Sequence, residues 1–117
     1  MTTSSSAERY RGELAIPSED ERHGVSVELN DDDGTVTLKF DDPVAGSSEW
    51  AGQNVVFMDR PKYQEIQFTT FDLPKETVEL IWKMNKSKLD NTIAGVVVAR
   101  PNAVRVRGEK GYILTRA

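Results

Sequence analysis

The sequence predicts a mainly β protein, either an antiparallel sandwich or a small, partly open barrel of seven or eight short strands. Three observations predict this class. Apolar and polar residues alternate with a period of two along much of the chain, turn-forming residues interrupt it at short intervals, and only residues 73–88 fit a helix. The alternative is an α+β domain in which that one helix packs on an antiparallel sheet.

Three strands are predicted in the first forty residues. Tyr10–Ile16 alternates in polarity until Pro17 stops it, although Gly12 weakens the pattern. Val25–Leu29 and Val36–Phe40 alternate without interruption, which is typical of strands with one buried face.

The stretch ELNDDDGTVTLKFDD, Glu28–Asp42, predicts a hairpin between the second and third strands. The two strands can share one apolar face only if the loop holds an even number of residues, because a slip of one residue inverts every side chain. A two-residue loop at Asp33-Gly34 or at Asp32-Asp33 meets this condition. Asp and Gly suit such a loop because they tolerate left-handed backbone conformations.

The middle of the chain predicts a loop and then two strands. Residues 41–49 are rich in Pro, Gly and Ser, and Trp50 closes this loop. Gln53–Met58 and Lys62–Phe71 are predicted to be strands joined by a turn at Asp59–Pro61, where the proline favours the turn.

The segment Asp72–Leu89 fits two structures. As a helix, it has Asp72 as the N-cap and Pro74 in the first turn. As a strand, it has an alternating apolar face made of Val78, Leu80, Trp82 and Met84. The helix start favours a helix at about 73–88, and the strand is kept as the alternative.

The last third predicts a central strand and a closing hairpin. Ile93–Ala99 is apolar on both faces, which indicates a strand that is covered on both sides. A turn at Arg100–Ala103, an alternating strand at 104–107 and a second turn at Gly108–Gly111 follow. Tyr112–Thr115 is predicted to be the last strand.

The composition bounds the class and the compartment. The chain has 117 residues, enough for one domain over 8–117 that buries about two thirds of its unfolded surface, behind a disordered tail at 1–7. It has no cysteine, which excludes disulfides, thiolate nucleophiles and cysteine-bound zinc. Because no secretory signal and no apolar run of membrane length is present, a cytoplasmic location is expected.

Charge is unevenly distributed along the chain. Residues 1–59 hold 4 basic and 13 acidic side chains, whereas residues 60–117 hold 11 and 6, and the net charge is −4. Such asymmetry can create a surface that binds a polyanion or a partner. The interpretation favoured here is that the two halves neutralise each other, within one fold or across a dimer.

The acidic residues form two groups, one at each end of the predicted hairpin. The group at the tip does not fit a calcium loop, because alignment on Gly34 puts Leu29 and Phe40 where oxygen ligands are needed. The group at the other end is a candidate for cation binding and consists of Glu19, Asp20, Glu21, Asp41 and Asp42. A solvated acidic surface explains the same residues more simply, so no metal or cofactor is expected.

The sequence offers little catalytic machinery. His23 is the only histidine, so a catalytic triad has one candidate base, and a histidine-rich metal site lacks its ligands. No glycine-rich run precedes a helix to bind phosphate. An enzyme is therefore not expected.

Two binding sites are candidates. Arg105 and Arg107 face the same side of one predicted strand, and a two-residue loop at Glu109-Lys110 would put Arg107 opposite Tyr112. Cationic side chains beside an aromatic ring are typical of surfaces that bind single-stranded nucleic acid. Trp50 could line a small-molecule or carbohydrate site, or anchor its loop to the core.

Taken together, these patterns predict a non-enzymatic protein-interaction or assembly module whose partner is another protein or a second copy. The first alternative is a barrel or sandwich that binds a small molecule or carbohydrate beside Trp50. The second is nucleic-acid binding by Arg105, Arg107 and Tyr112, which the acidic first half of the chain disfavours.

Overall fold

The computed structural model describes residues 7–17, 21–44, 47–71, 79–100 and 109–117. These residues form nine antiparallel strands and no helix. The strands are β1 (Glu8–Ala15), β2 (Arg22–Asn30), β3 (Thr35–Val44), β4 (Ser47–Ala51), β5 (Gln53–Asp59), β6 (Tyr63–Phe71), β7 (Glu79–Ser87), β8 (Thr92–Arg100) and β9 (Glu109–Arg116). The prediction of a mainly β fold is confirmed, with nine strands in place of seven or eight.

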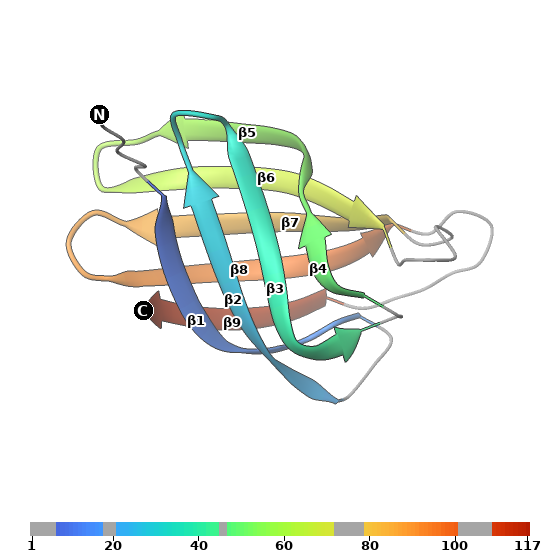
Figure 1. Cartoon of the computed structure of the whole chain (residues 1–117). Helices are drawn as coiled ribbons and strands as arrows, with labels where there is room; N and C mark the ends of the chain where they lie inside the picture. Colours follow the sequence, from blue (N-terminus) through green and yellow to red (C-terminus); the bar gives the residue numbers. More distant parts are fainter. Residues whose placement is uncertain (1–6, 18–20, 45–46, 72–78, 101–108) are drawn as a thin grey trace, which may run out of the picture.

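All nine strands belong to one sheet in the order β4-β3-β2-β1-β9-β8-β7-β6-β5, which curls into a nearly closed barrel. In Figure 1, β1–β4 cross in front of β5–β9, so the two groups of strands form two layers around a common interior. None of the described residues forms a helix long and apolar enough to cross a membrane.

Gly52 joins the two ends of the sheet. It separates β4, which pairs with β3, from β5, which pairs with β6, and its N–H donates to the carbonyl of Val36 at 2.8 Å. A Cβ at this position would lie 2.9 Å from the Phe68 ring, so a residue without a side chain lets the chain turn closely over the core.

The hairpin confirms the expected parity but not the expected loop length. Leu29 pairs with Val36 and Asn30 with Thr35, so the loop is the four residues 31–34. Gly34 has a φ of 69°, and the Asn30 side chain accepts from the N–H of Asp33 at 3.1 Å, a hydrogen bond that closes the loop. The even count puts the apolar side chains of both strands on the inner face.

The expected helix at 73–88 is wrong where the structure describes it, because Glu79–Ser87 is strand β7. Leu80, Trp82 and Met84 are buried inside the barrel, and β6 and β8 pair with the backbone on both sides. The helix start at Asp72 is a local signal, and the residues that carry it lie outside the described ones. Pairing with two neighbouring strands outweighs such a local preference.

Two predicted loops are strands in part. The prediction of a loop at 41–49 is wrong for the described residues, because β3 continues to Val44 and β4 begins at Ser47. The prediction of a turn at Gly108–Gly111 is wrong from Glu109 onward, because residues 109–111 pair with β8. Neighbouring strands supply the hydrogen bonds that hold these stretches extended. The predicted turn at Arg100–Ala103 and the strand at 104–107 lie outside the described residues, except that Arg100 ends β8.

The interior is packed with large apolar side chains around Trp82. Its ring stacks on Phe68 at 5.7 Å and meets Tyr112 edge-on at 6.0 Å, and its Nε1 donates to the Thr70 hydroxyl at 2.9 Å. The other large side chains that are almost fully buried are Trp50, Leu14, Leu29, Leu38, Ile66, Leu80, Met84, Ile93, Leu114 and Val25. The barrel interior is therefore a hydrophobic core.

Candidate functional site

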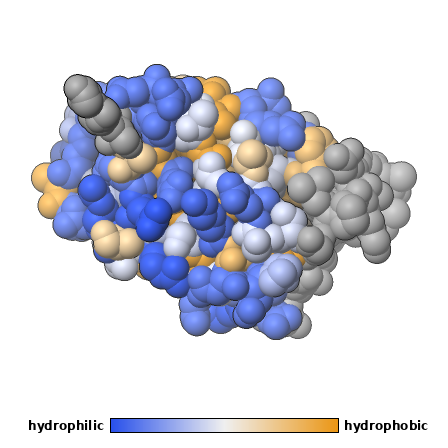
Figure 2. Space-filling model, viewed as in Figure 1, coloured by the Kyte–Doolittle hydropathy of each residue, from blue (hydrophilic) through white to orange (hydrophobic). Residues whose placement is uncertain are grey.

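The outer surface of β1, β2 and β3 is a network of ion pairs. It contains the pairs Arg9–Glu28, Lys39–Glu28, Arg11–Asp41 and Arg22–Glu13. Hydrogen bonds from Arg9 and Lys39 lower the pKa of the Glu28 carboxyl below its usual value. Figure 2, which views the molecule from this side, shows a largely hydrophilic surface. This side has the character of a solvated face.

The opposite side of the barrel is different. Because Trp82, Val97 and Leu114 face inward, the residues beside them on β7, β8 and β9 face outward. Strand pairing arranges nine outward residues in three rows: Asn85, Ala94 and Ile113; Lys83, Val96 and Gly111; Ile81, Val98 and Glu109. These nine residues are called the β7–β9 outer face.

This face is mostly apolar and is not covered by the described chain. Ile113 is 68% exposed, Ala94 is exposed, and Ile81, Val96 and Val98 are half-buried. The prediction that Ile93–Ala99 is central is confirmed, because β8 lies between β7 and β9. The expectation that it is covered on both sides is not met among the described residues, which bury only its inner face.

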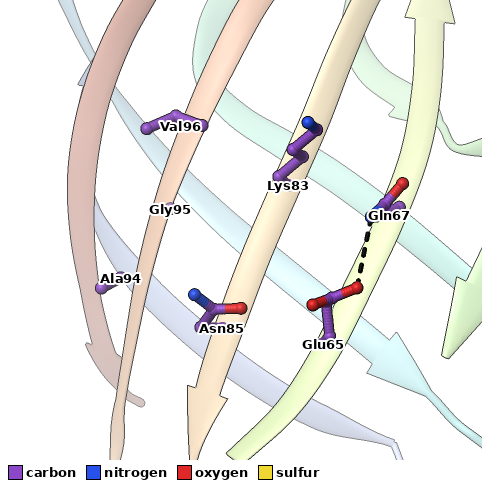
Figure 3. A pocket seen from close by; sticks show the side chains of 7 residues that line it. All are labelled: Glu65, Gln67, Lys83, Asn85, Ala94, Gly95 and Val96. Atoms are coloured by element: carbon purple, nitrogen blue, oxygen red, sulfur yellow. Dashed lines mark hydrogen bonds between the residues drawn. The ribbon is translucent and has the colours of Figure 1, made fainter. Parts of the chain in front are cut away.

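A hollow of about 450 Å³ lies over this side of the barrel. Figure 3 shows Lys83 and Asn85 standing on β7 between two side chains of β6 and the small residues of β8. The lining residues are Glu65, Gln67, Lys83, Asn85, Ala94, Gly95 and Val96. Because the outward side chain of Ala94 is short, the floor over β8 is low there. An apolar floor with a few polar groups at its edge is typical of a contact surface.

The two charges of this face have no partner within the described chain. Lys83 of β7 and Glu109 of β9 make no ion pair or hydrogen bond with a described side chain, in contrast to the charges on β1–β3. Both are exposed. A basic group and an acidic group therefore flank the apolar row of β8.

One end of the barrel joins the acidic and basic halves of the chain. Glu8 pairs with Lys86 at 2.7 Å and with Arg116 at 2.9 Å, and Asp59 pairs with Lys88 at 2.8 Å. Burial opposes ionisation of Glu8, yet the hydrogen bond and charge of Lys86 and the charge of Arg116 hold its pKa below the usual value. These contacts support neutralisation of the two halves within one fold.

The two aromatic residues proposed as ligand contacts are buried. Tyr112 faces inward and pairs with Gly95 of β8, whereas the expected pairing of Tyr112 with Arg107 involves a residue outside the described ones. Burial also raises the pKa of the Tyr112 hydroxyl. Arg105 and Arg107 lie outside the described residues, and nucleic-acid binding by them stays a prediction.

Trp50 lies on β4 and is 2% exposed, with its ring edge-on to Phe40 at 4.9 Å. It does not line the hollow over β7 and β8. Its Nε1 is buried and has no hydrogen-bond partner among the described residues. The anchoring role matches this position, whereas a ligand site beside Trp50 stays a prediction.

Replacing Trp50 with phenylalanine is expected to change the free energy of unfolding by less than about 1 kcal/mol. The substitution removes ring volume but also removes a buried N–H that lacks a partner, and these two effects oppose each other. The matched control is Trp82→Phe, which strands the Thr70 hydroxyl and is expected to cost about 1–3 kcal/mol. Urea unfolding followed by circular dichroism measures both, and an equal loss in the two variants would contradict this assignment.

The candidate cation group is dispersed where the structure describes it. Glu21 and Asp42 are exposed, Asp41 pairs with Arg11, and Glu19 and Asp20 lie outside the described residues. Among described residues, no group of three or more acidic or histidine side chains could hold a metal ion. His23, half-buried on β2, meets Phe40 edge-on at 6.2 Å.

The fold and surface define an antiparallel barrel with one ion-paired face and one apolar face. No family model, curated protein or solved structure matches the chain.

Proposed function

We propose that this protein is a non-enzymatic interaction or assembly module that binds a protein partner with the β7–β9 outer face. One observation carries the proposal: charges on the outer side of β1–β3 are paired with each other, whereas β7–β9 expose aliphatic side chains and two charges that have no ion-pair partner among the described residues. Contiguous exposed apolar surface with polar groups at its edge marks protein interaction sites.

The side chains available for chemistry support binding over catalysis. The chain has one histidine and no cysteine, and His23 packs against the Phe40 ring. The hollow on the outer face offers Glu65 of β6 and Lys83 and Asn85 of β7, whose spacing across two strands suits contacts with a surface. A general base is usually oriented by a neighbouring group, and the contact found here is one hydrogen bond of 3.3 Å that Gln67 donates to the exposed side of Glu65, which leaves its carboxylate stabilised and not activated.

A second candidate is binding of a small polar molecule inside the barrel. It is favoured by two buried donors, Trp50 Nε1 and Tyr112 Oη, that have no hydrogen-bond partner among the described residues. Buried polar groups of this kind are normally satisfied by a ligand or by ordered water. The outer face is preferred as the functional site because it is already accessible.

Site-specific photo-crosslinking in the cells that make the protein tests the proposed function. A photoreactive phenylalanine analogue at Val96, in the middle of the apolar face, is expected to give discrete protein adducts. The matched control is the same analogue at Thr37, which is also half-buried and outward-facing but lies on β3 among the ion pairs. Adducts from neither position, or the same adducts from both, would contradict the proposal.

A further inference from the structure

We propose that the partner is a second copy of this chain, and that two copies pack with their β7–β9 outer faces against each other. This inference rests on the proposed function and names its partner. It is argued from the arrangement of side chains on the face, from its charges and from its area.

The face is arranged so that it can contact itself. When two sheets pack face to face, their strands run within about 30° of each other and the sheets lie about 10 Å apart. A two-fold axis between the sheets that runs along β8 puts β8 on β8 of the second copy and β7 on its β9. The apolar row of β8, which is Ala94, Val96 and Val98, then meets the same row and forms the centre of the contact.

Side-chain size is complementary in this arrangement. Lys83 and Gly111 lie on either side of Val96 in one row, so Lys83 of each copy stands over Gly111 of the other. Gly111 has no side chain, and a Cβ there would find only the Gly95 carbonyl, at 3.8 Å. The longest side chain of the face therefore meets its lowest point.

Charge is complementary in the same arrangement. Glu109 precedes Gly111 by two residues on β9, so its carboxylate lies beside the place that Lys83 of the second copy reaches. Both groups lack a partner within the described part of one copy. The two-fold axis creates this ion pair twice, at the two edges of the apolar centre, where charged groups contribute to specificity.

The area of the face suits a dimer that dissociates on dilution. β7, β8 and β9 pair side by side, and each has eight or nine residues. Three strands at about 4.8 Å spacing and about 28 Å length give a flat sheet face of roughly 400 Å². Side-chain relief raises the accessible area, and a standard interface buries about 800 Å² per partner, so this contact is among the smaller and weaker interfaces.

Sedimentation equilibrium of the full chain tests the dimer with a charge-reversal cycle. The wild type is expected to reach twice the 13.1 kDa mass of the chain and to dissociate on dilution. Lys83→Glu and Glu109→Lys are each expected to raise the dimer Kd about a hundredfold. Each substitution removes both symmetry-related Lys83–Glu109 ion pairs, and each ion pair is expected to change the Kd about tenfold. The double variant K83E/E109K restores the pair with reversed sign and is expected to return the Kd to near the wild-type value.

Lys62→Glu is the matched control, because Lys62 is also an exposed lysine without a described ion pair but lies in the turn before β6. It is expected to leave the Kd unchanged. A mass of 13.1 kDa at every concentration, or single variants that dimerise like the wild type, would overturn the inference. If the wild type is monomeric but crosslinks from Val96 to another protein, self-association is wrong and the proposed function stands. If both experiments are negative, both proposals are wrong.

Discussion

Replacing Trp82 with alanine is expected to lower the free energy of unfolding by about 3–5 kcal/mol. Trp82 is fully buried and lies between the rings of Phe68 and Tyr112, so its removal leaves a cavity that both rings border. The substitution also removes the hydrogen bond that Trp82 Nε1 donates to the Thr70 hydroxyl. Thr70 is 2% exposed, so its hydroxyl would be left buried without this partner. Few positions in the barrel combine loss of volume with loss of a buried hydrogen bond.

Guanidinium unfolding followed by the fluorescence of Trp50 measures this loss. The Trp82→Phe variant separates its two parts, because it keeps a ring in the core and loses only the hydrogen bond and part of the volume. The alanine variant is expected to lose more free energy of unfolding than the phenylalanine variant. The difference between the two losses is the cost of the larger cavity. A loss below about 1 kcal/mol for alanine would mean that Trp82 does not organise the core.

The second large effect is expected from Gly95→Ala, which should cost about 2–3 kcal/mol. Tyr112 lies across Gly95 on the inner face of the sheet, and a Cβ on Gly95 would lie 2.6 Å from its hydroxyl oxygen. The same Cβ would lie 2.8 Å from the backbone carbonyl of Lys83, which belongs to the paired strand. Tyr112 is held by packing against Trp82, so neither neighbour can move away without disturbing the core.

Gly111→Ala is the matched control for this prediction. Gly111 pairs with Val96, close to Gly95 in the sheet, but a Cβ there would make only an ordinary contact of 3.8 Å with the Gly95 carbonyl. Alanine there is expected to change stability by no more than about 0.5 kcal/mol. Thermal unfolding measures both variants at a protein concentration where sedimentation shows only the monomer, and equal destabilisation would contradict the steric explanation.

Much of the fold could be predicted from the sequence because a half-buried strand imposes a period of two. The strands at Val25–Leu29, Val36–Phe40 and Lys62–Phe71 were predicted by alternation alone, and parity predicted which residues of the hairpin face inward. These signals are local in the sequence. They do not depend on which strands become neighbours.

The errors lie where distant strands decide the local structure. Asp72 and Pro74 favour a helix start, but Leu80 and Trp82 are held extended by β6 and β8. Glu109 has a glycine on its N-terminal side and a second glycine two residues later, yet it pairs with Val98. Turn and cap chemistry acts within a few residues, whereas sheet pairing recovers hydrogen bonds from residues far along the chain.

The candidate surface could not be predicted because periodicity does not reveal what covers a face. Ile93–Ala99 is apolar on both faces, and the simplest interpretation was that the protein itself covers both. The structure leaves Ala94 exposed and Val96 half-buried on the outer side. The same apolar pattern is expected when a second molecule covers one face. For Trp50, the preceding Gly-Ser-Ser-Glu sequence indicates a loop. The structure instead places Trp50 in strand β4 with its side chain buried in the core.

Solvent accessibility of individual methyl groups distinguishes most directly which face makes the contact. A neutral paramagnetic gadolinium chelate broadens the NMR signals of methyl groups that solvent reaches. At high protein concentration, the methyls of Ala94, Val96 and Ile113 are expected to be protected, and dilution or Lys83→Glu should expose them. The methyl of Thr37 on β3 should stay accessible throughout. Equal broadening of all four residues at every concentration would contradict a contact through the β7–β9 outer face.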